Sequence, residues 1–524
     1  MKWGKLLSII FYGGFAAPLL ANNISVSNVS LTGRNVSAGP NNAANYVYVT
    51  CDVRWENSWR TSTPPGNWDA AWVFIKYRVG SGAWKHATLH PSMHLPPSGA
   101  TITPSSDGKG VFLYSSADNS GTVNYPGIKL RWDYGADGVL DNDRVTANVL
   151  AIEMVYVPQG TFSLGSGGFE SGSFTDGSWT SGASIPFSVT SENALTINTG
   201  GGNLWGTSTS GLNTIGSAGT LPASFPKGYN AFYCMKYSIG QGQYVDFLNL
   251  LTFSQQATRT AVSPDSSAGS YAMFTTGQSQ HRSGIKIRVP GIATSTPAVY
   301  ACDLSGDGNY NQPDDGQDVA CDYLSWADGV AYAAWAGLRP MTELEFEKAC
   351  RGTAVPVPGE LAWGTTNSTP ATSVTNSGTG SETASPSNAN SNFNNSLAVP
   401  GPLRVGIFAG VSTNREQSGA TVYGIMDMSG DLWERTVTVG SLTGRAFAGS
   451  HGTGVLDASG NPSGVSDWPG TNADGSGFRG GVWDSPSFFM DVSDRSVAAL
   501  TSDVRGGNSN SAGTRGFRAV RTAP

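Results

Sequence analysis

Glycine occupies 68 of the 524 positions in this chain, and charged residues make up only 13% of it. Glycine weakens the interior of helices and favours turns and tight loops. We therefore predict turn-rich β structure with long ordered loops, and we exclude an all-helical fold. A chain of this length is expected to form two or three domains, each with its own core.

The charges are spread along the whole chain, with a formal net charge of −7 and no basic block. Such a distribution lacks the cluster of positive charge that is typical of proteins that bind nucleic acid or anionic lipid. We expect an extracellular protein or glycan ligand, or a small molecule, and no nucleic acid.

The N-terminus has the pattern of an export signal. Basic residues lie within Met1 to Lys5, the stretch from Leu6 to Leu20 is apolar, and Ala21 precedes a polar segment. We predict a signal peptide over residues 1–21 and a secreted or cell-surface protein. A membrane anchor is the alternative, but the apolar run is shorter than the ~20 residues that span a bilayer. No later segment is apolar enough to be transmembrane.

Five cysteines are present, which is an odd number for an oxidising compartment. At least one thiol is therefore free or paired between chains. Cys302 and Cys321 bracket a polar loop. They either form a disulfide bridge or both remain free thiols. Cys234 and Cys350 have apolar neighbours, so we expect buried, inert thiols.

Residues 22–150 show short alternating strands, such as 46–49 and 72–77, separated by Gly, Pro, Asn and Asp clusters. This spacing predicts an antiparallel, Ig-like β-sandwich. Its tryptophans serve either the core or a glycan-binding face. The acidic turn 133–143 suits Ca²⁺ or a solvated hairpin. A second domain is expected over 151–524.

Three helices are expected in this second domain. Apolar residues at helical spacing predict one over 243–251. Ser325 with Asp328, and Thr342 with Glu345, predict the N-termini of two more. The Ser-, Thr-, Asn- and Pro-rich stretch 353–402 is expected to be a long surface loop.

Six segments then occur in a characteristic order: 154–162, 232–249, 326–352, 423–434, 478–483 and 515–518. This order resembles the formylglycine-generating, sulfatase-modifying-factor family. The resemblance implies an α+β architecture in which the N-terminal β-sandwich precedes a C-type-lectin-like domain with few helices and many loops.

In that family the segment matching 423–434 wraps a structural Ca²⁺. The resemblance implies side-chain oxygens from Asp427 and Glu434 and backbone carbonyls from Gly430 and Leu432. Hard cations prefer such oxygen ligands. The alternative is a solvated β-turn, and the acidic loop 303–318 resembles calcium loops in spacing only.

Active members of the family bind copper through two cysteines, six and eleven residues after the arginine of an Arg-Gly-Gly strand. Here that arginine is Arg479, and the two positions are Ser485 and Met490. A hydroxyl and a thioether cannot form the dithiolate that holds Cu(I). We expect no copper and no family oxidase activity.

Other relatives bind non-haem iron through histidines of an additional helical domain. His86, His90 and His94 are four residues apart, but the prolines and the β pattern around them argue against a helix. We therefore expect no metal site at these histidines.

Loss of the reactive pair leaves a scaffold that displays loops, and binding is the function we expect. The surface at the former active site is expected to use aromatic, methionine and polar side chains. These are Trp483, Asp484, Ser485, Ser487, Phe488, Phe489, Met490 and Asp491. A core role for Phe488 or Phe489 is the alternative. Some relatives diversify the region that corresponds to 482–515, and variability there is a hypothesis.

Three functional classes follow. The first is a secreted, non-catalytic binding or adhesion protein. The second is a surface-layer or filament subunit that self-associates. The third is an oxidoreductase of the sulfatase-modifying-factor or non-haem-iron type.

Overall fold

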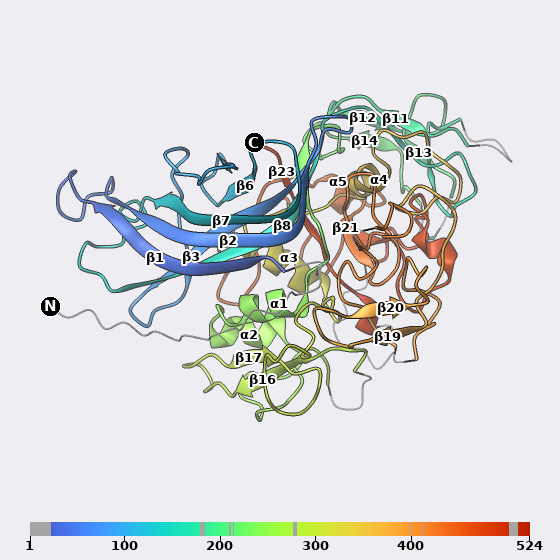
Figure 1. Ribbon diagram of the computed structural model, residues 1–524. Coiled ribbons are helices and arrows are strands. Elements are labelled where there is room, and N and C mark those ends of the chain that lie inside the picture. Colours follow the sequence, from blue (N-terminus) through green and yellow to red (C-terminus); the bar gives the residue numbers. More distant parts are fainter. Residues whose placement is uncertain are drawn as a thin grey trace.

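The computed structural model describes residues 23–178, 184–208, 211–212, 214–275, 280–398, 400–410, 412–501 and 512–524 (Figure 1). The expected signal peptide lies outside these residues. Strands and loops dominate, and the described part has five α-helices. This mixed composition agrees with the predicted α+β class. None of the described helices has the length and apolar character that crossing a bilayer requires.

The N-terminal region contains a small antiparallel sheet in the order β1-β2-β7. Its strands are β1 (Ser25–Asn35), β2 (Tyr46–Arg60) and β7 (Asn119–Trp132). Buried and half-buried residues alternate along the first half of β2 because successive side chains point to opposite faces. Val49, Cys51 and Leu130 of this sheet share one core with Val73 and Ile75 of the next sheet.

The second sheet has eight strands, seven of them in the order β18-β23-β15-β8-β3-β6-β5, with β4 paired to β3. Its strands are β3 (Asp69–Val79), β4 (Lys85–His86), β5 (Ala100–Pro104), β6 (Val111–Ser115), β8 (Val145–Val157), β15 (Phe232–Met235), β18 (Arg339–Pro340) and β23 (Ala519–Thr522). β8 pairs with β3 through most of its length and with β15 at its end. It therefore runs across the boundary that we placed between residues 150 and 151, and the two regions share this sheet.

Both faces of β3 are covered, which explains why it is buried almost throughout. Ala71, Val73 and Ile75 face the core shared with the small sheet. Trp72 and Phe74 face a larger core, which includes residues of α1 and α3. The arrangement of two packed sheets agrees with a sandwich, while its Ig-like assignment and the division into separate folding units stay predictions.

The helices are α1 (Gln241–Leu248), α2 (Phe253–Arg259), α3 (Trp326–Trp335), α4 (Glu343–Arg351) and α5 (Leu442–Arg445). α1 and α3 pack on the face of the large sheet opposite the small sheet, whereas α4 packs against Val155, Val157 and Cys234 on the other face. The capping boxes of Ser325 with Asp328 and of Thr342 with Glu345 are confirmed. α1 begins and ends earlier than expected, and α2 is a helix that we did not predict.

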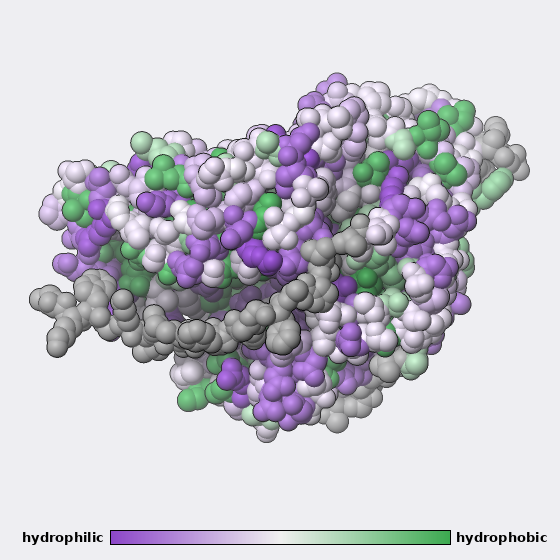
Figure 2. All heavy atoms as spheres, in the orientation of Figure 1, coloured by the Kyte–Doolittle hydropathy of each residue, from purple (hydrophilic) through white to green (hydrophobic). Residues whose placement is uncertain are grey.

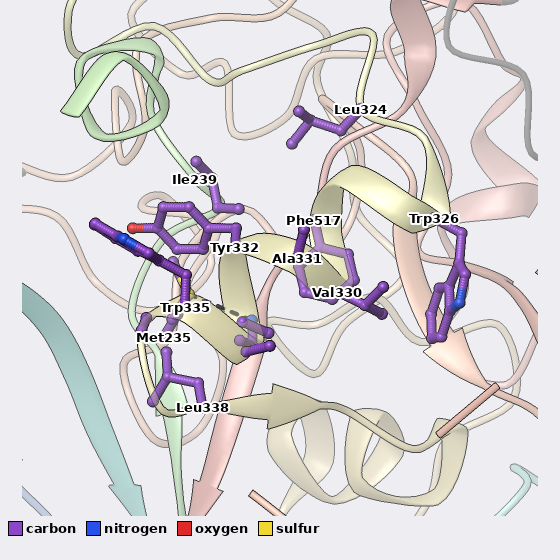
Figure 3. Close-up of a cluster of buried hydrophobic side chains, with 14 of the residues drawn as sticks. Met235, Ile239, Leu324, Trp326, Val330, Ala331, Tyr332, Trp335, Leu338 and Phe517 are labelled. Atoms are coloured by element: carbon purple, nitrogen blue, oxygen red, sulfur yellow. Dashed lines mark hydrogen bonds between the residues drawn. The ribbon is translucent and has the colours of Figure 1, made fainter. Parts of the chain in front are cut away.

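Every residue of α3 is buried, so this helix is the centre of the larger core (Figure 3). Trp326 and Trp335 lie at its two ends, and Phe517 lies against it beside Ala331. A side chain at Gly329 would collide with the Phe517 ring. Glycine at this position thus lets the C-terminal segment approach the helix and deliver β23 to the sheet.

The remaining strands are short pairs that stabilise long loops. They are β9 (Phe162–Leu164), β10 (Phe174–Thr175), β11 (Phe187–Val189), β12 (Leu195–Ile197), β13 (Trp205–Gly206), β14 (Gly219–Leu221), β16 (Ile285–Val289), β17 (Val299–Cys302), β19 (Ser373–Thr375), β20 (Thr383–Ser385), β21 (Glu434–Val437) and β22 (Ser476–Arg479).

The expectation of a plain surface loop over 353–402 was wrong. This stretch contains the β19–β20 hairpin and contributes Ala371, Ala389 and Leu397 to a separate small core. Its acids Glu360 and Glu382 are buried and ion-paired with Arg351 and Arg282. Ion pairs with arginines outside the stretch, one of them 100 residues away in the sequence, hold this polar stretch inside the fold, and composition does not reveal them.

Candidate functional site

The segment that follows β22 begins and ends at a buried arginine, and both arginines bind the same glutamate. Glu343, at the start of α4, accepts hydrogen bonds from Arg479 Nη1 at 3.1 Å and from Arg495 Nε at 2.7 Å. All three side chains are fully buried. Glu343 therefore fixes both ends of the segment 479–495, which carries the predicted ligand-binding residues.

The anchoring network extends beyond this triad. Arg479 also binds Glu347 at 2.8 Å, and Glu347 binds Arg351 at 3.1 Å. Burial by itself raises the pKa of Glu343, but the Arg495 and Arg479 guanidiniums lower it by more, so the net shift is downward. Glu343 is therefore ionised at neutral pH and holds the two guanidiniums by charge-assisted hydrogen bonds.

Three of the eight predicted ligand-binding residues are buried. The Trp483 indole N–H donates to the Gly513 carbonyl at 3.0 Å, and the Ser485 hydroxyl contacts the backbone of Val482 at 3.0 Å. Met490 is fully buried, and its sulfur lies 3.4 Å from the Ser391 hydroxyl. These three side chains support the segment from within and do not line its surface, contrary to our expectation.

The other five, Asp484, Ser487, Phe488, Phe489 and Asp491, are exposed or half-buried. Most of them lie on or beside the 3₁₀-helix η1 (Ser487–Met490). Phe488 is 52% exposed, and its ring centroid lies 4.3 Å from that of Phe489. Phe489 in turn packs edge-on against Trp433 at 5.6 Å. Phe489 is therefore the inner member of the pair, and Phe488 points to solvent.

Two further segments that the sequence reasoning missed lie beside η1. Phe169 is 83% exposed, Val355 is 84% exposed and Val357 is 43% exposed. A backbone N–H of one segment, Gly359, donates to Glu170 of the other at 2.6 Å. The Val492 N–H donates to the Glu360 carbonyl at 2.8 Å, which joins the η1 segment to them.

We call Phe169, Val355, Val357 and Phe488 the apolar patch. Figure 2 shows one face of the molecule, on which hydrophobic residues form small groups among polar ones. The apolar patch comes from three segments that hydrogen bonds join at Gly359 and Val492, and each segment exposes at least one large apolar side chain. The signal for this patch in the sequence was a large apolar residue, Phe169, within a Gly- and Ser-rich loop.

Three carboxylates, those of Asp491, Glu170 and Asp494, belong to the segments that form the apolar patch. Asp491 is partly buried, and burial raises its pKa to about 8, with further increases from the nearby charges of Glu170 and Asp494. The backbone of Asp491 is hydrogen-bonded to Phe488 and Asp494, whereas its carboxylate has neither a hydrogen bond nor an ion pair with any residue that the structure describes. A basic group from a ligand would stabilise its ionised form.

Of the four residues of the predicted calcium site, Asp427, Gly430 and Leu432 lie in the turn before β21, and Glu434 is the first residue of that strand. Glu434 Oε1 accepts from Arg518 Nε at 2.8 Å and from Ser238 Oγ at 3.0 Å, whereas Glu434 Oε2 is buried without a partner. Asp427 accepts the Gly406 N–H at 2.7 Å, and Gly430 and Leu432 are buried in the turn.

An unpartnered Glu434 oxygen suits a cation, but Arg518 already neutralises that carboxylate. The donor set therefore fits calcium only in part, and calcium stays a prediction. Asp431, which we did not select, is also buried in this turn; burial raises its pKa to about 7, and the Asp427 charge adds to the shift. It accepts hydrogen bonds from Asn392 and the Leu403 N–H, each at 2.8 Å.

Comparison with known proteins places this geometry in a family. The model of the sulfatase-modifying factor enzyme 1-like domain matches residues 143–523, from the beginning of β8 to β23. The chain belongs to this family. The match covers the helices, the anchored segment and the turn before β21, so the resemblance drawn from the sequence is confirmed.

One relative is the hercynine oxygenase of Mycolicibacterium smegmatis (strain ATCC 700084 / mc(2)155). It is 33% identical over 122 residues, which are 23% of this chain and 22% of that protein. The chain therefore matches about a fifth of this relative's length.

The thiols of this sulfatase-modifying-factor-like chain lie in its cores, and Cys234 and Cys350 share a core with Met490 and Val492 of the anchored segment. All five cysteines are buried and free, so the suggested Cys302–Cys321 bridge was wrong. Burial raises the pKa of Cys234 to about 12 and also raises the pKa of Cys302 and Cys321. Both members of the suggested pair sit in the main core as thiols, where apolar packing accounts for them.

The histidines are also used structurally. The His86 ring contacts the Lys109 carbonyl at 2.7 Å, and the His94 ring contacts the His90 carbonyl at 2.7 Å. Across the described ranges, no three His, Cys, Asp or Glu side chains are placed to hold a metal ion. In the turn 133–143, Asp137 and Asp141 accept hydrogen bonds from the surrounding chain, as in a closed hairpin turn.

Proposed function

We propose that this family member is a secreted, non-catalytic binding protein whose ligand is another extracellular protein. The observation that carries the proposal is the apolar patch, to which neighbouring segments contribute large exposed side chains. Such patches on soluble proteins mark interaction sites. Phe488 and Phe169 are the anchors we assign, since buried aromatic side chains contribute much of the energy of protein interfaces.

The chemistry at the family's catalytic positions supports this reading. The hydroxyl of Ser485 is tied to Val482, and Met490 is buried under the turn at Gly430. Neither residue supplies a thiolate, and the five thiols are in the cores. Arg479 and Arg495 still anchor the segment that carries η1. This anchoring positions η1 at the surface and does not depend on catalysis.

Oxidoreductase activity is the second candidate, because the relative named above is an oxygenase. It requires a bound transition metal. The discriminating measurement is the metal content of the purified protein.

Self-association in a surface layer or filament is the third candidate, and β1 is the feature that favours it. Among the described strands, β1 pairs with β2 alone, and its Val29 and Leu31 are 40% and 41% exposed. Its ladder is interrupted between Ser27 and Ser30 and between Thr32 and Asn35. Bulges of this kind protect exposed edges from pairing, so we rank self-association below ligand binding.

The test places a photo-crosslinking amino acid at position 488 of the secreted full chain. Leu140, in the N-terminal region, is the matched control because it is also 52% exposed. We expect a discrete crosslinked partner from 488 and none from 140. Phe488→Ser and Phe169→Ser should then each weaken binding of that partner at least about tenfold, since anchor residues contribute at least ~1–2 kcal/mol. Equal crosslinking from both positions, or unchanged affinity in both variants, refutes the proposal.

A further inference from the structure

A cleft lined by none of the apolar-patch residues lies elsewhere on the protein. It measures about 590 Å³ and lies between the β3–β4 hairpin, the turn joining α1 to α2, and the loop 294–299. Residues of the N-terminal region form one wall and residues of the family domain form the other. Its size is within the range of pockets that hold small ligands.

Arg78, in β3, is the one charged residue that lines this cleft among the described residues. Its guanidinium lies 4.8 Å from the centre of the Trp84 ring. The Arg78 side chain makes neither a hydrogen bond nor an ion pair with any residue that the structure describes, and its buried Nε has no partner. In a chain with a net charge of −7, an uncompensated guanidinium in a cleft is a place for an anion.

The rest of the lining combines apolar surface with hydroxyl groups. Trp84, Phe253 and Val299 supply apolar surface, and Ser254, Thr294 and Ser295 supply exposed hydroxyls. No carboxylate lines the cleft in the described part of the chain. The lining therefore offers a flat aromatic side chain, several hydroxyl donors and acceptors, and a single fixed positive charge.

We propose that this cleft binds a saccharide that carries a carboxylate. A guanidinium pairs with a carboxylate through two parallel hydrogen bonds, which explains the unpaired Arg78. The apolar face of a sugar ring suits contact with Trp84, because an amphipathic aromatic ring offers apolar area beside polar groups. The serine and threonine hydroxyls match the hydroxyls of the sugar. This site is independent of the apolar patch and of the protein ligand proposed for it.

The test measures binding of oligogalacturonate, a hyaluronan oligosaccharide and sialyllactose to the full secreted chain by titration calorimetry. The methyl ester of each sugar is the uncharged counterpart. We expect at least one acid to bind with a stoichiometry of one and about 10- to 100-fold more tightly than its ester, the range for a hydrogen-bonded charge pair.

Arg78→Gln should remove the preference for the acid over the ester, and Trp84→Ala should weaken binding of both. Lys85→Gln is the matched control, because Lys85 is an exposed cation in β4 outside the cleft lining. Thermal unfolding of each variant establishes that it is folded. Phe488→Ser should leave saccharide binding unchanged. The saccharide proposal can therefore be refuted independently of the proposal that the apolar patch binds a protein. Absence of saturable binding by all three acids, or an acid preference that survives Arg78→Gln, overturns the proposal.

Discussion

Replacing Glu343 by glutamine should weaken the anchoring of the segment 479–495, which carries the proposed binding surface. In the wild-type protein the Glu343 carboxylate holds Arg479 and Arg495 and also accepts from the Thr438 hydroxyl at 2.9 Å and the Val439 N–H at 2.8 Å. After the substitution Arg479 keeps Glu347 as a partner. Arg495 loses its carboxylate contacts from Glu343 and keeps the Gly172 carbonyl and the Phe174 ring.

The size of the effect follows from burial. Glu343, Arg479 and Arg495 are all fully buried, and removing one partner from such a pair costs about 3–5 kcal/mol because a charge is left uncompensated. The control is Arg34→Gln, which removes the half-exposed pair between Arg34 and Asp141. Exposed pairs contribute below about 1 kcal/mol, so this control should be close to wild type.

The assay is urea unfolding followed by tryptophan fluorescence, at pH 7 and at lower pH. Because the pKa of Glu343 is lower in the folded state, its contribution is complete above its unfolded value of 4.5 and is lost as pH falls through the folded value. The difference between wild type and Glu343→Gln should therefore shrink below pH 4.5. A loss under 1 kcal/mol at pH 7, or a difference that grows on acidification, contradicts the proposed anchoring role.

Three further predictions concern calcium, the thiols and Asp491. Millimolar Ca²⁺ should raise the Tm relative to EGTA, by an amount equivalent to about 2.7 kcal/mol at a concentration of 100 Kd, and Asp427→Asn should reduce the shift; an unchanged Tm removes calcium from the turn. Maleimide should label five thiols in the unfolded chain and essentially none in the native protein, and three labelled thiols on unfolding would restore the Cys302–Cys321 bridge. Since the pKa of Asp491 is raised to about 8, the folded chain retains a proton that the unfolded chain releases, so stability should fall as pH rises from 4 to 8. Asp491→Asn should flatten that slope, and an identical slope in the variant contradicts the assigned pKa.

Local signals in the sequence predicted local structure well. Ser325 with Asp328 and Thr342 with Glu345 are capping boxes because each uses only residues within one helical turn. Thr252 and Gln255 form the same motif at the start of α2, so the signal for that helix was present and was missed. The family was also predictable, since the order of its segments survives in the linear sequence.

Long-range contacts account for what the sequence did not predict. The burial of Glu360 and Glu382 depends on Arg351 and Arg282, which lie in other segments. The sequence singled out the candidate segment 482–491 but did not predict which of its side chains are exposed. A single turn of 3₁₀-helix turns Phe488 outward and Met490 inward, and the contribution of Phe169 requires the fold to bring its loop beside η1.

The central proposal is that this scaffold binds a ligand without the metal-dependent oxidation that its sequence resemblance implies for active relatives. The most direct test titrates the purified, secreted chain with Cu(I) and with Fe(II), measures the bound metal, and assays oxidation of a cysteine-containing peptide. We predict less than about 0.1 equivalent of either metal bound tightly and no conversion of the peptide; that threshold is tenfold below the one metal per chain of a catalytic site. One equivalent of tightly bound copper or iron together with oxidised peptide would contradict the claim and establish the chain as an oxidoreductase.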